Sequence, residues 1–155
     1  MKAVNKILGY VIAALLAFMV IGCCWQVITR FVLNNPSKYT EEILRYLLIW
    51  MTMLGAPYAY GLEKHLSINI ITKTFQPKNM LFTRIFIELV ILFISIFVLI
   101  LGGIMVTGNA AGQISPALQM PMQMYYACLP VSGVLMVLYS VERLIRFTKQ
   151  IKEGK

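Results

Sequence analysis

Four long apolar segments constrain this chain more than any other feature of its sequence. They cover about residues 7–29, 41–62, 84–106 and 123–146. A helix rises about 1.5 Å per residue and the hydrocarbon core of a bilayer is about 30 Å thick, so roughly 20 apolar residues suffice for one crossing. The sequence therefore predicts one domain, residues 1–155, that is all-α and crosses a membrane four times.

The overall composition agrees with a membrane protein. Hydrophobic residues make up 59% of the chain and charged residues only 13%, which is more apolar than a soluble domain allows. The net charge of +8 could suggest a nucleic-acid partner. We expect no nucleic acid, because the basic residues stand between the apolar segments instead of forming one solvated patch.

The distribution of the basic residues predicts the orientation. Lys and Arg collect on the cytoplasmic side of membrane proteins. The third connection, 107–123, carries no charge, and the first has only Arg30 and Lys38, whereas most other basic residues flank the termini and the second connection. Both termini are therefore expected in the cytoplasm. The residues on that side are Lys2, Lys6, Lys64, Lys73, Lys78, Arg84, Arg143, Arg146, Lys149, Lys152 and Lys155.

The N-terminal segment also fits a second interpretation. Lys2 and Lys6 before an apolar run are typical of a secretory signal peptide, and residues 20–23 (VIGC) are similar to a lipoprotein cleavage site. The apolar run continues past Cys23 through Trp25 and Ile28, which is longer than a signal peptide needs. We therefore expect the first span to be retained.

The cysteines and the histidine indicate no cofactor. Cys23, Cys24 and Cys128 lie inside apolar segments and are odd in number, so they form no disulfide framework. Neighbouring helical residues point about 100° apart, and the only histidine, His65, lies on the opposite side of the predicted layout. We interpret the cysteines as small core residues and expect no metal site.

Three charged residues open the second span. Thr40 is a plausible N-cap, with Glu41 and Glu42 in the positive first turn of the helix. Arg45 follows Glu41 by four residues and Glu42 by three, so one helix face can bring the three charges into a neutral cluster. This cluster either anchors the helix end at the headgroups or docks a partner chain, since charges at the membrane boundary tend to face protein or water.

Small residues predict close helix contacts. Gly55 and Ala59 stand four apart in the second span and would allow another helix to approach, with Pro57 between them. Gly102 and Gly103 would do the same at the outer end of the third span.

Other residues have simpler interpretations. The spacing of Arg84 with Glu88, and of Glu142 with Arg146, predicts helical ion pairs at the membrane interface. Pro130 is expected to loosen the fourth span.

The connections carry two further features. Residues 65–75 predict a short interfacial helix, in which His65 is an interfacial or capping residue instead of a proton relay. The external connection around Ser115, Pro116 and Pro121 is apolar and is expected to pack on protein.

No catalytic constellation is present. The sequence lacks a Cys-x-x-Cys pair, a glycine-rich phosphate loop, a second histidine and a central carboxylate pair, so we predict that the protein is not an enzyme. A stand-alone homo-oligomeric exporter or channel of four helices is the alternative function. Small exporters use a carboxylate in the middle of the first span, and this chain has none there.

Three motifs on this four-span layout resemble one family. Residues 39–50 (YTEEILRYLLIW), 54–56 (LGA) and 65–69 (HLSIN) are similar to the signature of the small membrane subunit of tripartite ATP-independent periplasmic (TRAP) transporters, the DctQ-like subunit. Residues 115–118 (SPAL), with Met120 and Pro121, match the external connection of that family. The resemblance covers essentially the whole chain.

The resemblance implies a function in the bacterial inner membrane. In such systems a periplasmic binding protein captures an organic acid, such as a sialic acid or a four-carbon dicarboxylate, and a large permease subunit moves it with a sodium gradient. The small subunit holds neither the substrate nor the sodium site; it supports the large subunit within the lipid and helps to receive the binding protein.

The resemblance also assigns roles to residues of this chain. The charged motif would meet the large subunit or the docked binding protein, a middle stretch of the second span would pack on the partner, and a further motif would form the cytoplasmic turn. These residues are Glu41, Glu42 and Arg45 for the charged motif, Trp50, Gly55 and Ala59 for packing, and His65 and Asn69 for the turn.

Overall fold

The computed structural model describes residues 2–35, 37–62 and 77–152. Within these ranges every regular element is a helix, and the only pairing of the β type is one isolated bridge between Ile114 and Pro121. The all-α prediction is confirmed. The interfacial helix predicted over 65–75, with His65 and Asn69, lies outside the described residues. The elements are α1 (Lys2–Phe31), α2 (Lys38–Gly61), α4 (Pro77–Ile94), the π-helix η1 (Ser95–Gly102), α5 (Gly103–Asn109), α6 (Gln123–Tyr126) and α7 (Cys128–Lys152).

Three helical segments of the described chain are long and apolar enough to cross a membrane. They are Ala3–Phe31, Ile85–Asn109 and Gln123–Thr148. They overlap the predicted spans 7–29, 84–106 and 123–146, and each ends two or three residues beyond the predicted end. The helical run that contains the third predicted span begins earlier than expected, at Pro77 of α4.

The remaining predicted span, 41–62, corresponds to α2. This helix has 24 residues, about 36 Å at the rise of an α-helix, so its length suffices for a crossing. It is not among the three apolar candidates. Its first two turns carry Lys38, Glu41, Glu42 and Arg45, and the rest of the helix includes Pro57 and several tyrosines, so its mean hydropathy is low.

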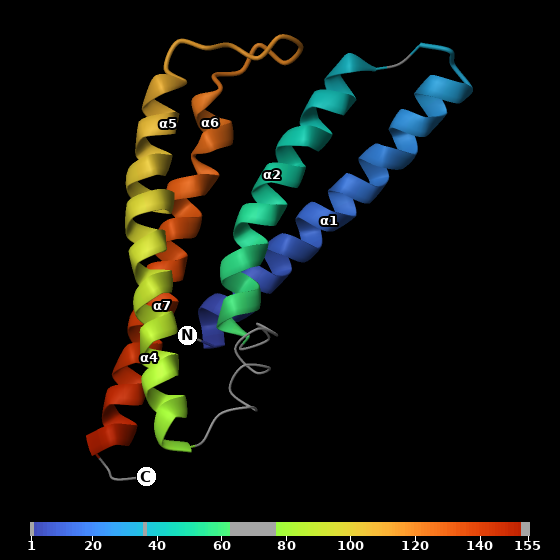
Figure 1. Ribbon diagram of the computed structural model, residues 1–155. Helices are drawn as coiled ribbons and strands as arrows, with labels where there is room; N and C mark the ends of the chain where they lie inside the picture. The colour runs from blue at the N-terminus through green and yellow to red at the C-terminus, as the bar shows by residue number, and fades with distance from the viewer. Residues whose placement is uncertain (1, 36, 63–76, 153–155) are drawn as a thin grey trace.

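The helices form two antiparallel pairs. α1 lies against α2, and the continuous run of α4, η1 and α5 lies against α6 and α7 (Figure 1). The pairs meet where α2 contacts α7, close to the end of the molecule that holds both chain termini. We call this the terminal end. At the opposite, distal end the pairs splay apart, and the connection between α5 and α6 extends across the top of the molecule (Figure 1).

The last helical segment is divided near a proline. α6 ends at Tyr126 and α7 begins at Cys128. Pro130 has no N–H to donate to the carbonyl of Tyr126, so one hydrogen bond of a continuous helix is missing at this point. The prediction that Pro130 loosens this span is confirmed.

Several polar side chains are buried inside the molecule, whereas many large apolar side chains are exposed on its surface. The buried polar side chains include Glu42, Glu88, Ser95, Ser132 and Ser140. Large apolar side chains are exposed along nearly the whole length of α1 and along the outer faces of the other helices. Lipid tails are as apolar as leucine, so helices in a membrane are held together by close packing and hydrogen bonds instead of apolar burial. This distribution is that of a membrane protein.

A buried polar cluster joins the two pairs at the terminal end. Glu88 is 2% exposed; its carboxylate accepts hydrogen bonds from the hydroxyls of Tyr60 and Ser140, the latter at 3.0 Å, and pairs with the guanidinium of Arg143 at 3.3 Å. Arg143 also donates to the carbonyl oxygen of Tyr60 and lies 4.0 Å from the centroid of its ring. We call these four residues the Glu88 cluster. It fastens α2, α4 and α7 together.

The two predicted helical ion pairs have different outcomes. Glu142 and Arg146 form theirs, at 3.6 Å. Glu88 was also expected to pair with Arg84 in its own helix, a prediction that the described residues do not test; its carboxylate pairs with Arg143 of α7. The side chain of Arg84 lies outside the described residues.

The predicted small-residue contacts hold in one place. A Cβ atom at Gly103 would lie 3.0 Å from atoms of Leu129 and Pro130, so this glycine does allow α5 and α7 to approach closely. Gly102 meets only the carbonyl oxygen of Phe97 in its own helix, at 3.7 Å. Gly55 has open space around its Cβ position, so within the described chain no helix uses the gap that it leaves.

Candidate functional site

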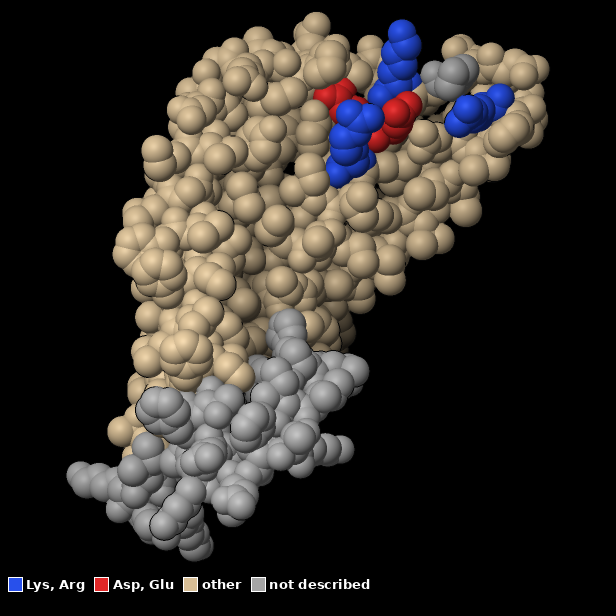
Figure 2. Space-filling model, in the orientation of Figure 1, with Lys and Arg blue, Asp and Glu red and all other residues tan. Residues whose placement is uncertain are grey.

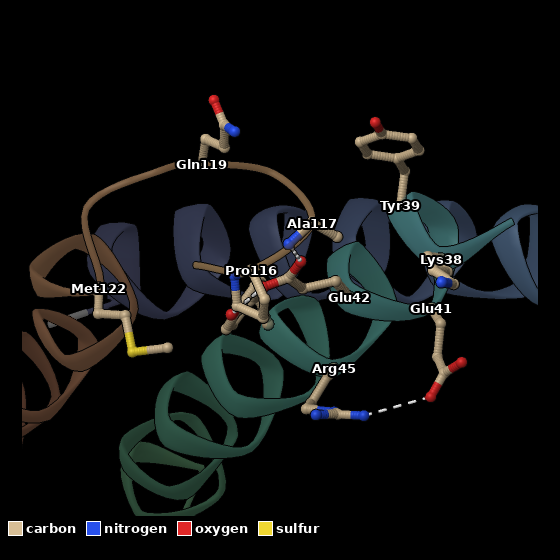
Figure 3. A pocket seen from close by; sticks show the side chains of 10 residues that line it. Lys38, Tyr39, Glu41, Glu42, Arg45, Pro116, Ala117, Gln119 and Met122 are labelled. Carbon is tan, nitrogen blue, oxygen red and sulfur yellow. Dashed lines mark hydrogen bonds and ion pairs between the residues drawn. The ribbon is translucent and has the colours of Figure 1, made fainter. Parts of the chain in front are cut away.

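A cleft of about 580 Å³ opens at the distal end of the molecule. One wall is the beginning of α2, and the other is the connection between α5 and α6 (Figure 3). We call it the distal cleft. Its lining residues are Lys38, Tyr39, Glu41, Glu42, Arg45, Tyr46, Pro116, Ala117, Gln119 and Met122.

The α2 wall begins with a serine cap. The hydroxyl oxygen of Ser37 accepts a hydrogen bond from the backbone N–H of Thr40 at 3.3 Å and another from its hydroxyl at 2.9 Å. Such a side chain satisfies an N–H group that has no partner in the first helical turn. The prediction of Thr40 as the N-cap is therefore wrong by three residues, and of the two glutamates expected in the first turn only Glu41 lies there.

The opposite wall is a small hairpin formed by residues 113–122. Backbone hydrogen bonds close it, from Ser115 N–H to the Met120 carbonyl and from Met122 N–H to the Gln113 carbonyl, each at 3.0 Å. Gln119 at the tip has a φ of 53°, and Gly112 just before the hairpin has a φ of 83°, which glycine adopts without a steric penalty. We call this segment the distal hairpin.

Glu42 joins the two walls. Its carboxylate is 7% exposed and accepts hydrogen bonds from the hydroxyl of Ser115 and from the backbone N–H groups of Ala117 and Leu118, the last two at 2.8 and 3.1 Å. The hydroxyl of Tyr46, one turn along α2, donates a fourth at 2.6 Å. A buried carboxylate is tolerated only when such donors replace its water, and four donors satisfy both oxygens.

Glu41 and Arg45 form a separate, solvated pair. The Arg45 guanidinium lies 3.2 Å from the Glu41 carboxylate, and their side chains are 67% and 59% exposed (Figure 3). The prediction that Glu41, Glu42 and Arg45 form one neutral cluster is therefore wrong for Glu42. Its side chain points away from Arg45 and toward the distal hairpin. The hairpin offers it backbone donors that a helix surface cannot provide.

The rim of the cleft is charged while the surrounding surface is not. In the view of Figure 2, basic and acidic side chains gather at the distal end, and the rest of the described surface on this face carries none. Lys38, Glu41 and Arg45 line the cleft on the α2 side. No group of three or more His, Cys, Asp or Glu residues in the described chain could hold a metal ion. The arrangement suits recognition of a polar surface instead of a reaction.

The structure brings together some of the predicted site residues. Glu41, Glu42, Arg45 and Pro116 line one cleft, and Ser115 reaches it through Glu42. Within the distal hairpin, residues 113–122, only Ser115 is buried, so the expectation that this segment packs on protein holds for one of its residues within this chain. Pro116 and Pro121 are exposed. Trp50, Gly55 and Ala59 are partly exposed residues of α2 that do not line the cleft, and His65 and Asn69 lie outside the described residues.

Two tyrosines at the site were missed. The ring of Tyr46 stacks on that of Tyr125 from α6, with 13° between the ring planes. The buried hydroxyl of Tyr125 has no hydrogen-bond partner in the described part of the chain. One signal could have pointed to Tyr46: Glu42 stands at the start of an apolar helix, and a hydroxyl four residues later is the nearest donor on its own helix.

Comparison with known proteins identifies the family. The profile described as "Tripartite ATP-independent periplasmic transporters, DctQ component" matches residues 19–150. The chain is 28% identical to the sialic acid TRAP transporter small permease protein SiaQ of Vibrio cholerae, over 96% of this chain and 85% of that protein. It is also 27% identical to a Haemophilus influenzae protein provisionally named a TRAP transporter small permease, over 92% of this chain and 88% of that protein.

A third relative is much longer than this chain. The sialic acid TRAP transporter permease protein SiaT of Haemophilus influenzae is 27% identical over all of this chain but only 24% of its own length. All three relatives are transporter components, which confirms the prediction that the chain is not an enzyme. The match over residues 19–150 shows that this chain belongs to the DctQ family, the small permease component of TRAP transporters.

Proposed function

We propose that this chain is the scaffold of a sodium-driven TRAP importer in a bacterial inner membrane. In this proposal it holds the large permease subunit in place and helps to dock a periplasmic binding protein. The large subunit carries the substrate and sodium sites. The match of the whole chain to about a quarter of a longer permease protein supports a large permease as the partner.

The observation that carries the scaffold role is the exposed apolar surface. On α1 alone the exposed side chains include Tyr10, Phe18, Ile21 and Trp25, and α1 buries few residues in the described molecule. A surface of this size needs lipid or another protein to cover it. α2 contributes Gly55, where the open space around the Cβ position leaves room for a helix of the large subunit, and Ala59 lies one turn further on the same face.

Four crossings with both termini in the cytoplasm is the proposed topology. α2 is long enough for the fourth crossing, and its charges lie at one end, where headgroups and water begin. Both termini lie at one end of the molecule, as an even number of crossings requires (Figure 1). The basic residues flanking that end support its placement in the cytoplasm.

The distal cleft then faces the periplasm. Its charged rim, Lys38, Glu41 and Arg45, is placed where a soluble partner can reach it. Charged rims of this kind steer association and fix the register of a partner more than they add affinity. We therefore assign the docking of the binding protein to this cleft.

The cargo is an organic acid. Two relatives are components of sialic acid TRAP transporters, which supports sialic acid as the first compound to test. A four-carbon dicarboxylate is the second, because the residues that select the cargo belong to other chains in this proposal.

Uptake into proteoliposomes tests the function. Vesicles with an inward sodium gradient would hold this chain alone, its genomic neighbour among large permeases alone, or both, each with the cognate binding protein. We expect labelled sialic acid or dicarboxylate to enter only when both chains are present. Equal uptake by the permease alone would refute the scaffold role, and uptake by this chain alone would establish the alternative, a stand-alone exporter or channel.

A further inference from the structure

The distal hairpin is attached to α2 mainly through one carboxylate. Its own backbone bonds close it on itself, and three donors on the hairpin, at Ser115, Ala117 and Leu118, all end on Glu42. Figure 3 shows this carboxylate lying beneath the hairpin backbone at Ala117. The position of one cleft wall relative to the other therefore depends on Glu42.

Glu42 is poorly placed to bind a partner itself. It is 7% exposed, and its acceptor positions are already used by four donors. The exposed lining groups are others: Lys38, Glu41 and Arg45 on α2, and Pro116 and Gln119 on the hairpin. An incoming protein can touch these groups without displacing any bond of Glu42.

We propose that Glu42 is a positioning residue, which holds the distal hairpin against α2 so that the docking cleft is already formed before the binding protein arrives. This rests on the proposed docking function. A surface ordered in advance saves the entropy of ordering it on association. Loss of the attachment leaves the contact groups in place but lets one wall move, so docking weakens while the helices stay assembled.

The first measurement is the distance between the walls. Spin labels on Tyr39→Cys and Gln119→Cys, in a chain whose three native cysteines are replaced by alanine, report that distance in nanodiscs that contain the complete permease complex. We expect one narrow distance distribution with native Glu42 and a broad one with Glu42→Gln. Ser115→Ala removes a single donor and is expected to broaden the distribution less. An unchanged distribution in both variants would overturn the proposal.

The second measurement is docking, in the same complexes without labels. We expect Glu42→Gln to raise the binding-protein concentration that gives half-maximal uptake about tenfold, the effect of weakening one charged hydrogen bond. The maximal rate and the amount of large permease recovered with the chain should stay unchanged, which a general loss of structure would not allow. Glu142→Gln is the matched control, because it makes the same chemical change at a carboxylate that pairs with Arg146 and does not line the cleft.

The outcomes separate this inference from the function on which it rests. A broadened distance with normal docking would refute the positioning role and leave the docking function intact. If instead the binding protein supports uptake equally well when Lys38, Arg45 and Gln119 are all replaced by alanine, the cleft is not the docking site, and the proposed function fails at that point.

Discussion

Glu42 and Glu88 are both buried carboxylates of this bundle, but their partners differ in kind. Glu88 pairs with the guanidinium of Arg143 at 3.3 Å and lies between three helices at the terminal end. Glu42 accepts from two hydroxyls and two backbone N–H groups, and most of these belong to the distal hairpin. Glu88 therefore holds helices together, whereas Glu42 holds a connection against a helix.

The difference has a physical consequence. Removing one member of a buried ion pair leaves a charge without compensation, whereas neutral donors on a hairpin can turn back to water. We therefore expect the terminal end to be the fixed part of the molecule and the distal end to be the part that can open locally. Four substitutions test this comparison.

Arg143→Ala should have the largest effect. It leaves the buried carboxylate of Glu88 without its cation, which typically costs about 3–5 kcal/mol of unfolding free energy. The measurement is unfolding of the purified chain in micelles by titration with a denaturing detergent. Arg146→Ala is the control, because its pair with Glu142 is largely exposed and should contribute about 1 kcal/mol or less. Equal losses in the two variants would contradict a dominant Glu88 cluster.

Glu42→Gln should loosen the distal hairpin while the bundle stays folded. Amide hydrogen exchange at Ala117 and Leu118 is expected to become roughly ten- to a hundredfold faster, because their charged acceptor becomes a neutral amide. Exchange in the middle of α7 should not change. Faster exchange throughout the molecule would show that Glu42 supports the whole fold, and the contrast with Glu88 would then disappear.

Ser132→Ala should have a small global effect. Its hydroxyl donates to the carbonyl oxygen of Met53 at 2.6 Å, at a point of α2 between Glu42 and Tyr60, and interhelical bonds of this kind contribute about 0.6 kcal/mol on average. Thr52→Ala is the matched control, because the hydroxyl of Thr52 bonds within its own helix, to Leu48. If Ser132→Ala lowered the unfolding free energy as much as Arg143→Ala, the strongest contacts between helices would lie in the middle of the bundle.

Glu41→Gln should have the smallest effect on stability. Its pair with Arg45 is exposed and lies on one helix, which makes it worth about 0.3–0.5 kcal/mol. Detergent unfolding should place this variant within experimental error of the parent. A clear loss of stability would mean that Glu41 has a structural role similar to that of Glu42.

The sequence predicted what depends on local spacing. The long apolar segments indicated where the helices lie, although α4 begins seven residues before the predicted span, and the Glu142–Arg146 pair follows from a separation of four. The partners of Glu88 and Glu42 were not predicted, because Arg143 is 55 residues away and Ser115 is 73 residues away. The spacing rule considered only neighbours on the same helix, so it assigned Glu42 to Arg45 and Glu88 to Arg84. A carboxylate inside an apolar segment needs donors, but the sequence does not say from which helix they come.

The site was predicted in the same partial way. Glu41, Glu42, Arg45 and the external connection were chosen from the charged motif and the family resemblance, and the structure brings them to one cleft. That Glu42 binds the connection while Glu41 stays in water could not be read from two adjacent glutamates. Their helix positions differ by about 100°, and which one faces inward depends on how α2 rotates against its neighbours.

The bond between Glu42 and Leu118 also sets an order of events during synthesis. The two residues are 76 positions apart, so at about 5–20 residues per second the glutamate is made roughly 4–15 s before its last donor. Throughout that interval a carboxylate at the start of an apolar helix must remain hydrated. α2 can therefore take its final depth in the membrane only after the third helical segment has been translated, and the Glu88 cluster at the terminal end forms later still, once Arg143 has been made.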